Sequence, residues 1–317
     1  MGLLNRRHLR IKVLQSLYAY FQASNNDVLK KEKELLIAVD KIQDLYIYLL
    51  LTFPELKTKA EHRIEENKKK LLPKEEDINP NRKFVDSRIV KILEEHSALR
   101  QLSEEKKINW VGDTKQEILR KLYLHIRDSE TYFEFMNNGH DSFEDDKAFA
   151  VELFKVEIAN YPAIYDFFEE QSIHWLDDID LACSMVIKTL KAFKEDGENK
   201  ILPLYKPDDD ELEFIQTLFR KTITYDKENI EIIDQLTKNW EIDRIAKMDI
   251  VLMKMAITEL QEFPTIPKKV TLNEYIEISK FYSTPKSNVF INGVLDKAIS
   301  KLEKDNKIKK VGRGLMN

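Results

Sequence analysis

Apolar residues recur every three to four positions over most of the chain, and this spacing predicts amphipathic helices. The first such stretch runs from Leu3 to Gln22. We expect its arginines to face solvent, opposite an apolar stripe formed by Leu3, Leu4, His8, Ile11, Leu14, Gln15, Tyr18 and Phe21. The chain is therefore predicted to begin with a helix that has one basic and one apolar face.

The same periodicity continues to the far end of the chain, with few interruptions. It predicts helices over 27–50, within 87–137, and over 145–159, 162–171, 175–195, 208–224, 227–262 with a break near Trp240, 268–282 and 285–305. A further helix is expected to begin at Pro54, because proline is tolerated in a first turn but costs a hydrogen bond inside a helix. We predict an all-α protein without a sheet.

Loop-forming residues divide this pattern into five segments. We expect a basic first helix over 1–26, a helical insertion of unassigned role over 27–140, a further helical segment over 141–207, a helical core over 208–305 and a basic tail over 306–317. An offset of 65 residues superposes Phe149 on Phe214 and Trp175 on Trp240, which predicts that 145–191 duplicates 210–256. The alternative is that two amphipathic helices merely share an apolar rhythm.

Composition supports this picture and narrows the class of protein. Only 7 glycines and 9 prolines occur in 317 residues, and 34% of the residues are charged, which is typical of solvated helices joined by short loops. Cys183 is the single cysteine, so the chain forms no intramolecular disulfide. Apolar runs of membrane-spanning or signal-peptide type are missing, so we expect a cytoplasmic protein without membrane contact.

The net charge of −5 hides two basic ends. Arg6, Arg7, Arg10 and Lys12 stand in the first twelve residues without an acid, and six basic residues face two acids in the last seventeen. Such asymmetry favours an anionic partner, although basic termini are also common on proteins without one.

Motifs for catalysis, metal binding and nucleotide binding are missing from the sequence. The six histidines have no metal-ligating spacing, and neither HExxH, CxxC, GxGxxG nor GxxxxGK[ST] occurs. Acidic runs at 177–180 and 208–210 stand before predicted helices, where we expect them to cap N–H groups and complement the helix dipole. We predict a protein that is not an enzyme and carries no cofactor or metal.

The first helix suggests a binding function. Arg6, Arg7 and Arg10 fall within about one turn, so each guanidinium could meet a phosphate, while Gln15 and Tyr18 could touch a base edge or base face. The alternative is a solvated basic face above core aromatics.

Two regions resemble the NusB family of transcription antitermination factors. The segment NRRHLRIKVLQSLYAY, at 5–20, is similar to the arginine-rich first helix of that family. At the other end, DRIAKMDIVLMKMAITEL from Asp243, IPKKVTLNEYIEISKFYS from Ile266 and NVFINGVLDKAISKL from Asn288 resemble its last three helices, including the Phe-x-Asn-Gly-Val-Leu-Asp-Lys signature. The resemblance covers about 4–24 and 208–303.

This resemblance implies a fold, partners and site residues. It implies two packed helical bundles, a heterodimer with the small ribosomal protein NusE, and joint binding of single-stranded boxA RNA within the RNA polymerase antitermination complex. Asp249 and Glu259 would bind NusE. By this resemblance, the residues that face RNA would be Arg6, Arg7, Arg10, Gln15, Tyr18, Tyr282 and Phe290. We expect Lys12 and Lys286, which lie beside them in the sequence, to bind RNA as well.

The chain also departs from the family pattern and leaves rival functions open. His8 stands where relatives often have a third arginine, and Lys286 stands where many carry an acid. One rival is a NusB-like domain from an RNA cytosine methyltransferase lineage, which would need a glycine-rich cofactor fold that this sequence lacks. The other is a helical scaffold derived from NusB that has lost RNA binding.

Overall fold

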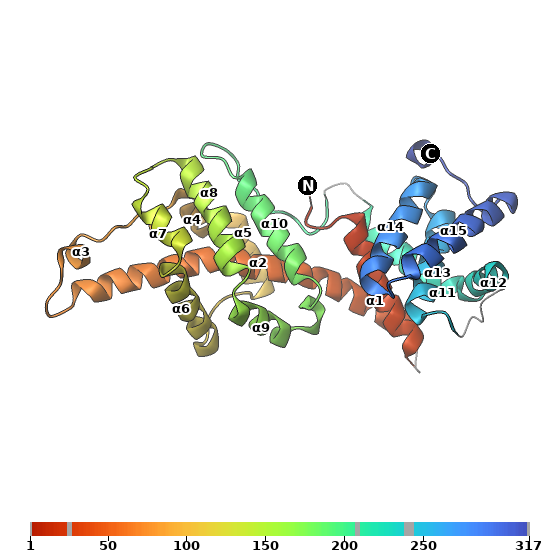
Figure 1. Cartoon of the computed structure of the whole chain (residues 1–317), viewed down its shortest axis with the longest axis horizontal. Coiled ribbons are helices and arrows are strands. Elements are labelled where there is room, and N and C mark those ends of the chain that lie inside the picture. The colour runs from red at the N-terminus through yellow and green to blue at the C-terminus, as the bar shows by residue number, and fades with distance from the viewer. Residues whose placement is uncertain (1, 24–26, 207–209, 238–243, 316–317) are drawn as a thin grey trace. The chain divides into compact units, whose positions relative to one another are not determined.

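The computed structural model describes all residues except 1, 24–26, 207–209, 238–243 and 316–317 (Figure 1). The described residues form helices and loops without a strand, which confirms the predicted all-α class. The chain divides into two compact units, one made of Asp40–Leu204 and the other of Gly2–Val39 with Tyr205–Asn317. Within the described residues, no helix combines the length and the apolar character that crossing a membrane requires.

The unit Asp40–Leu204 is built around the long helix α2 (Val28–Lys68), most of which belongs to it. Its other helices are α3 (Glu75–Ile78), α4 (Arg88–Glu95), α5 (Ser97–Lys106), α6 (Asp113–Arg127), α7 (Glu130–Asn137), α8 (Phe143–Leu153), α9 (Pro162–Gln171) and α10 (Ile179–Ala192). Helix α8 packs on α4 and α10, which flank it in Figure 1. The core contains an aromatic cluster of Tyr48, Trp110, Phe167, Phe168 and Trp175.

This unit runs across the boundary that the sequence suggested near residue 140. The division into five segments, including a separate segment over 141–207, stays a prediction.

Helix α2 corrects one expected helix start. Pro54 lies inside this single helix and does not begin a new one. An interior proline costs about 3 kcal/mol because it removes a backbone hydrogen bond and crowds the preceding turn. The flanking residues Leu50, Phe53 and Leu56 are fully buried, and tertiary burial of this size offsets the local cost.

The second unit contains α1 (Arg6–Gln22), α11 (Glu211–Thr224), α12 (Asp226–Leu236), α13 (Lys247–Glu262), α14 (Lys268–Tyr282) and α15 (Ser287–Lys304). Helix α13 is central, because it contacts α1, α11, α12, α14 and α15. Its residues 251–260 are all buried, including Lys254, Thr258 and Glu259. A helix buried on every side must satisfy its polar groups internally, and this requirement shapes the site described below.

Helix α1 is rotated relative to the predicted stripe. Its fully buried positions are Leu9, Val13, Leu14 and Leu17, whereas His8, Ile11, Gln15, Tyr18 and Phe21 are only partly buried. The buried face is also wider than one stripe, because α1 contacts three helices, α11, α13 and α14, and buries Arg10 and Lys12 as well.

The internal duplication stays a prediction. The superposed segments form similar pairs, since α8 packs on α10 and α11 packs on α13. They differ in detail, because Phe154–Ile158 forms a π-helical turn that α11 lacks. Trp240 and Asp243, on which the comparison also depends, lie outside the described residues.

The basic tail is attached to the second unit. Val311 N donates to Pro264 O over 3.0 Å, Lys310 Nζ donates to Phe263 O over 2.9 Å, and Lys307 pairs with Glu228. Burial lowers the pKa of Lys310 to about 8, a shift that the charge of Glu259 opposes. Part of the charge expected to attract an anionic partner is therefore used within the protein.

Candidate nucleic-acid interface

Helix α1 begins with a capping box that sets the geometry of its basic end. The Asn5 side chain accepts from His8 N over 3.1 Å, and His8 Nδ1 accepts from Asn5 N over 3.4 Å. Burial and the nearby charge of Arg7 lower the pKa of His8 to about 4. His8 is consequently neutral at physiological pH, and the positive charge at this end of α1 comes from its arginines.

Arg6 and Arg7 open onto a pocket of about 830 Å³. Each arginine is matched by an acid of the same unit. Arg7 donates to both carboxylate oxygens of Glu274 over 2.8 Å, and Arg6 forms an ion pair with Asp210 while its guanidinium lies 4.5 Å from the centre of the Phe214 ring. Lys206 also lines the pocket. We call this the arginine pocket, and its charged lining residues are Arg6, Arg7, Arg10, Lys206, Asp210 and Glu274.

Arg10 lines the same pocket, but its charged group is buried. Its side chain is 2% exposed, and it donates twice to Glu259, each time over 2.7 Å. Glu259 is fully buried and also accepts from Thr271 over 2.9 Å and from Tyr275 over 3.1 Å. Burial alone would lower the pKa of Arg10, but the charge and hydrogen bonds of Glu259 outweigh it and raise that pKa.

This geometry bears on two expected roles, RNA binding by Arg10 and partner binding by Glu259, which stay predictions. Glu259 accepts from Nε and Nη2 on one edge of the Arg10 guanidinium, Nη1 lies 3.7 Å from Glu274, and the Arg10 and Glu259 side chains are both buried rather than exposed to an RNA or a protein partner. The pair joins α1 to α13, where an unpaired buried charge would be costly. Sequence periodicity put Arg10 on the solvent face because the chain contains no local sign of its buried partner 249 residues away.

The remaining α1 candidates differ in exposure. Lys12 is 4% exposed, and its expected RNA contact stays a prediction. Gln15 and Tyr18 are partly exposed, as is Tyr282 at the end of α14. None of these three lines the arginine pocket or the second pocket described next.

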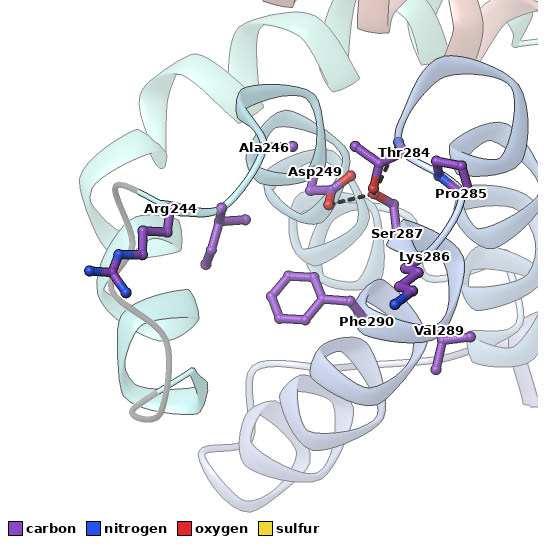
Figure 2. Close-up of a pocket in the computed structure, with 10 residues that line it drawn as sticks. Arg244, Ala246, Asp249, Thr284, Pro285, Lys286, Ser287, Val289 and Phe290 are labelled. Atoms are coloured by element: carbon purple, nitrogen blue, oxygen red, sulfur yellow. Dashed lines mark hydrogen bonds between the residues drawn. The ribbon is translucent and has the colours of Figure 1, made fainter.

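The second pocket lies where the loop before α15 meets the start of α13 (Figure 2). Its volume is about 580 Å³, and Asp249, Lys286 and Phe290 all line it. The Phe290 ring points into the pocket toward the segment that carries Arg244 and Ala246 (Figure 2). We call it the Phe290 pocket, and it brings together two predicted RNA-binding residues and one predicted partner-binding residue.

Asp249 fixes the loop that forms this pocket. Ser283 Oγ donates to Asp249 Oδ1 over 2.5 Å and Ser287 Oγ donates to Asp249 Oδ2 over 2.7 Å. Thr284 Oγ1 lies 2.8 Å from Ser287 Oγ and extends the network. Since the Asp249 side chain is buried, its direct effect is to hold residues 283–287 in place.

The Phe290 pocket combines an apolar wall with a basic rim. Ile245, Pro285, Val289 and Phe290 supply apolar surface, while Arg244 and the exposed Lys286 supply positive charge. An aromatic face next to cations suits an unstacked nucleobase whose neighbouring phosphates remain in water.

Comparison with known proteins identifies the family. The sequence model of the NusB family matches residues 181–300. The transcription antitermination protein NusB of Salinibacter ruber is 42% identical over 142 residues, which are 43% of this chain and 89% of that protein. The chain belongs to the NusB family.

Two further relatives carry the same name, transcription antitermination protein NusB. That of Natranaerobius thermophilus is 36% identical over 92 residues, or 29% of this chain and 66% of that protein. That of Chloroherpeton thalassium is 42% identical over 94 residues, or 28% of this chain and 44% of that protein. No solved structure matches the chain significantly.

The family model matches 181–300, whereas the motifs in the sequence indicated a resemblance over 208–303. It begins in α10, upstream of the start expected at 208, and it ends within α15. Asp249, Lys286 and Phe290 fall inside it, whereas α1 falls outside. The similarity of α1 to the first NusB helix therefore rests on its own residues.

The sequence did not indicate that four charged residues would line these pockets, namely Lys206, Asp210, Arg244 and Glu274. Asp210 was expected to cap a helix, yet it stands at the N-cap of α11 without a side-chain cap bond and pairs with Arg6. Asp208 and Asp209 lie outside the described residues. Within the described part of the chain, no three His, Cys, Asp or Glu side chains converge on a possible metal site.

Proposed function

We propose that this protein is a transcription antitermination factor that binds single-stranded, boxA-type RNA of nascent ribosomal transcripts together with NusE, within the RNA polymerase antitermination complex. The observation that carries the proposal is the Phe290 pocket inside the NusB match, where an aromatic ring and two cations surround one apolar hollow. The similar relatives carry the name transcription antitermination protein NusB.

Two surfaces of the protein would bind different parts of the RNA. The Phe290 pocket takes a base, because every base offers a π-face for stacking on the ring. Arg6 and Arg7 hold phosphates, and Tyr18 and Tyr282 supply further aromatic contacts on partly exposed parts of α1 and α14. Asp249 serves NusE and RNA indirectly, by ordering the loop 283–287.

The test is a fluorescence anisotropy titration of a boxA-type RNA and a scrambled RNA of equal composition, with and without purified NusE. Phe290→Ala should weaken boxA binding by roughly 5- to 150-fold, the equivalent of about 1–3 kcal/mol of base stacking. Phe281→Ala is the matched control, because Phe281 is 82% exposed on α14 and does not line the pocket.

The salt dependence of RNA affinity distinguishes contacts with phosphates from stacking on bases. Lys286→Gln should flatten the plot of log affinity against log salt by about 0.7 for a single strand, and Phe290→Ala should leave the slope unchanged. Lys297→Gln, an exposed change on α15 outside the pocket, controls for general charge. Equal affinity for boxA and scrambled RNA in the presence of NusE would refute the proposal, as would equal effects of Phe290→Ala and Phe281→Ala.

A further inference from the structure

Each cation that lines the arginine pocket is paired with an acid of the same unit. Glu274 engages Arg7 through two hydrogen bonds, Glu259 engages Arg10, and Glu211 lies 3.0 Å from Lys206. Asp210 pairs with Arg6. The basic end of α1 therefore meets an incoming polyanion already neutralised by carboxylates of its own unit.

Asp210 is more exposed to solvent than the other three acids. Its side chain is 53% exposed, whereas that of Glu274 is 19% exposed and those of Glu259 and Glu211 are fully buried. Burial increases the cost of breaking a pair, and exposed pairs contribute little to stability. Of the four acids, Asp210 is the one that a competing anion can displace without opening the core.

Lys206 and Asp210 both line the arginine pocket. The Lys206 N–H donates to the buried Glu211 over 2.8 Å, which ties Lys206 to the first turn of α11. A Cβ on Gly2 would lie 2.8 Å from Lys206 N, so the chain just before α1 passes directly against the same backbone. The contacts of Lys206 with Gly2 and with Glu211 thus lie in the same pocket as the pair of Asp210 with Arg6.

We propose that Asp210 is an internal competitor for RNA phosphate, whose carboxylate occupies the Arg6 guanidinium and lowers RNA affinity until RNA displaces it. Carboxylate and phosphate oxygens offer arginine the same kind of charge-assisted acceptor, so the two anions compete for one guanidinium. This inference rests on the proposed function, because it concerns regulation of the same RNA-binding surface.

The experiment compares Asp210→Asn with Glu213→Gln in the full-length protein, using the boxA-type RNA with NusE at low salt. Both variants remove one negative charge near the start of α11, but Glu213 does not line the arginine pocket. Asp210→Asn should bind RNA roughly 2- to 5-fold more tightly than Glu213→Gln, the range expected for releasing an exposed ion pair. Its salt slope should be steeper by up to about 0.7, corresponding to one added phosphate contact.

Repeating both acid substitutions in Arg6→Gln protein tests whether the gain in RNA affinity depends on Arg6. In Arg6→Gln protein, Asp210→Asn should gain no more affinity than Glu213→Gln. If the two acid variants gain equally in wild-type protein, the effect is one of net charge and the inference is overturned while the proposed function stands. If neither wild-type protein nor any variant binds RNA, the proposed function and the inference fall together.

Discussion

At the residue scale, the pairing of Arg10 with Glu259 shows how one contact reassigns two side chains. A guanidinium in a sequence pattern suggests phosphate binding, and a carboxylate on a family helix suggests a partner contact. Four hydrogen bonds to Glu259, two of them from Arg10, place both groups in the core. Arg10 and Glu259 stabilise the fold and hold α1 in position on α13.

We expect Glu259→Gln to destabilise the protein by about 3–5 kcal/mol, because it leaves the Arg10 charge buried without a counter-charge. Urea unfolding measures this free energy. Glu231→Gln, an exposed change on α12 of the same unit, should alter it by less than about 0.5 kcal/mol. A Glu259→Gln protein as stable as this control would contradict the assignment of the pair.

His8 makes the stability of the protein depend on pH. Its pKa falls to about 4 in the folded protein from an unfolded value of about 6.5, so the folded state favours neutral imidazole. Its contribution is complete above pH 6.5 and is lost as pH falls toward 4, where protonation also removes the Nδ1 acceptor of the capping box.

Replacing His8 by glutamine should therefore reduce the loss of stability between pH 7 and pH 4.5. The difference from wild type should be a few kcal/mol at most, following about 1.36 kcal/mol per pKa unit. Urea midpoints at pH 7, 5.5 and 4.5 measure it, with His62→Gln as the exposed control. Identical pH profiles for wild-type and His8→Gln proteins would show that the imidazole does not control this loss.

At the scale of elements, tertiary contacts decide where a helix or tail is held. Pro54 stays inside α2 because its neighbours are buried. The tail after α15 stays on the turn after α13 because Lys310 and Val311 bond to that turn. At Gly314, an added Cβ would lie 1.9 Å from Pro264 O, so only glycine fits there.

Gly314→Ala should release the tail, because a backbone carbonyl cannot move aside as a flexible side chain can. Trypsin should then cleave after Lys309 and Lys310 faster than in wild type, and amide hydrogen exchange over 306–315 should accelerate. Gly197→Ala is the control, since its Cβ would lie no closer than 3.5 Å to a neighbour. Equal cleavage of the two variants would show that the tail does not need Gly314.

At the scale of the whole molecule, the chain consists of a NusB-family region and a second compact unit, Asp40–Leu204, most of which precedes the family match. The match starts at 181, inside that unit, so family boundary and structural boundary do not coincide. The Salinibacter ruber relative is covered over 89% of its length by only 43% of this chain. Most of the additional length forms a helical unit with its own aromatic core.

The sequence by itself determined the helical class, most helix positions and the family, because these depend on local periodicity and on contiguous motifs such as the one containing Phe290. It also identified Arg6, Arg7, Lys286 and Phe290 as candidates. Only the tertiary structure decided which α1 face is buried, that Arg10 and Glu259 belong to the core, and that Asp210 meets Arg6. Those outcomes depend on residues more than 200 positions apart, whose approach is set by packing around α13 and leaves no periodic trace in the sequence.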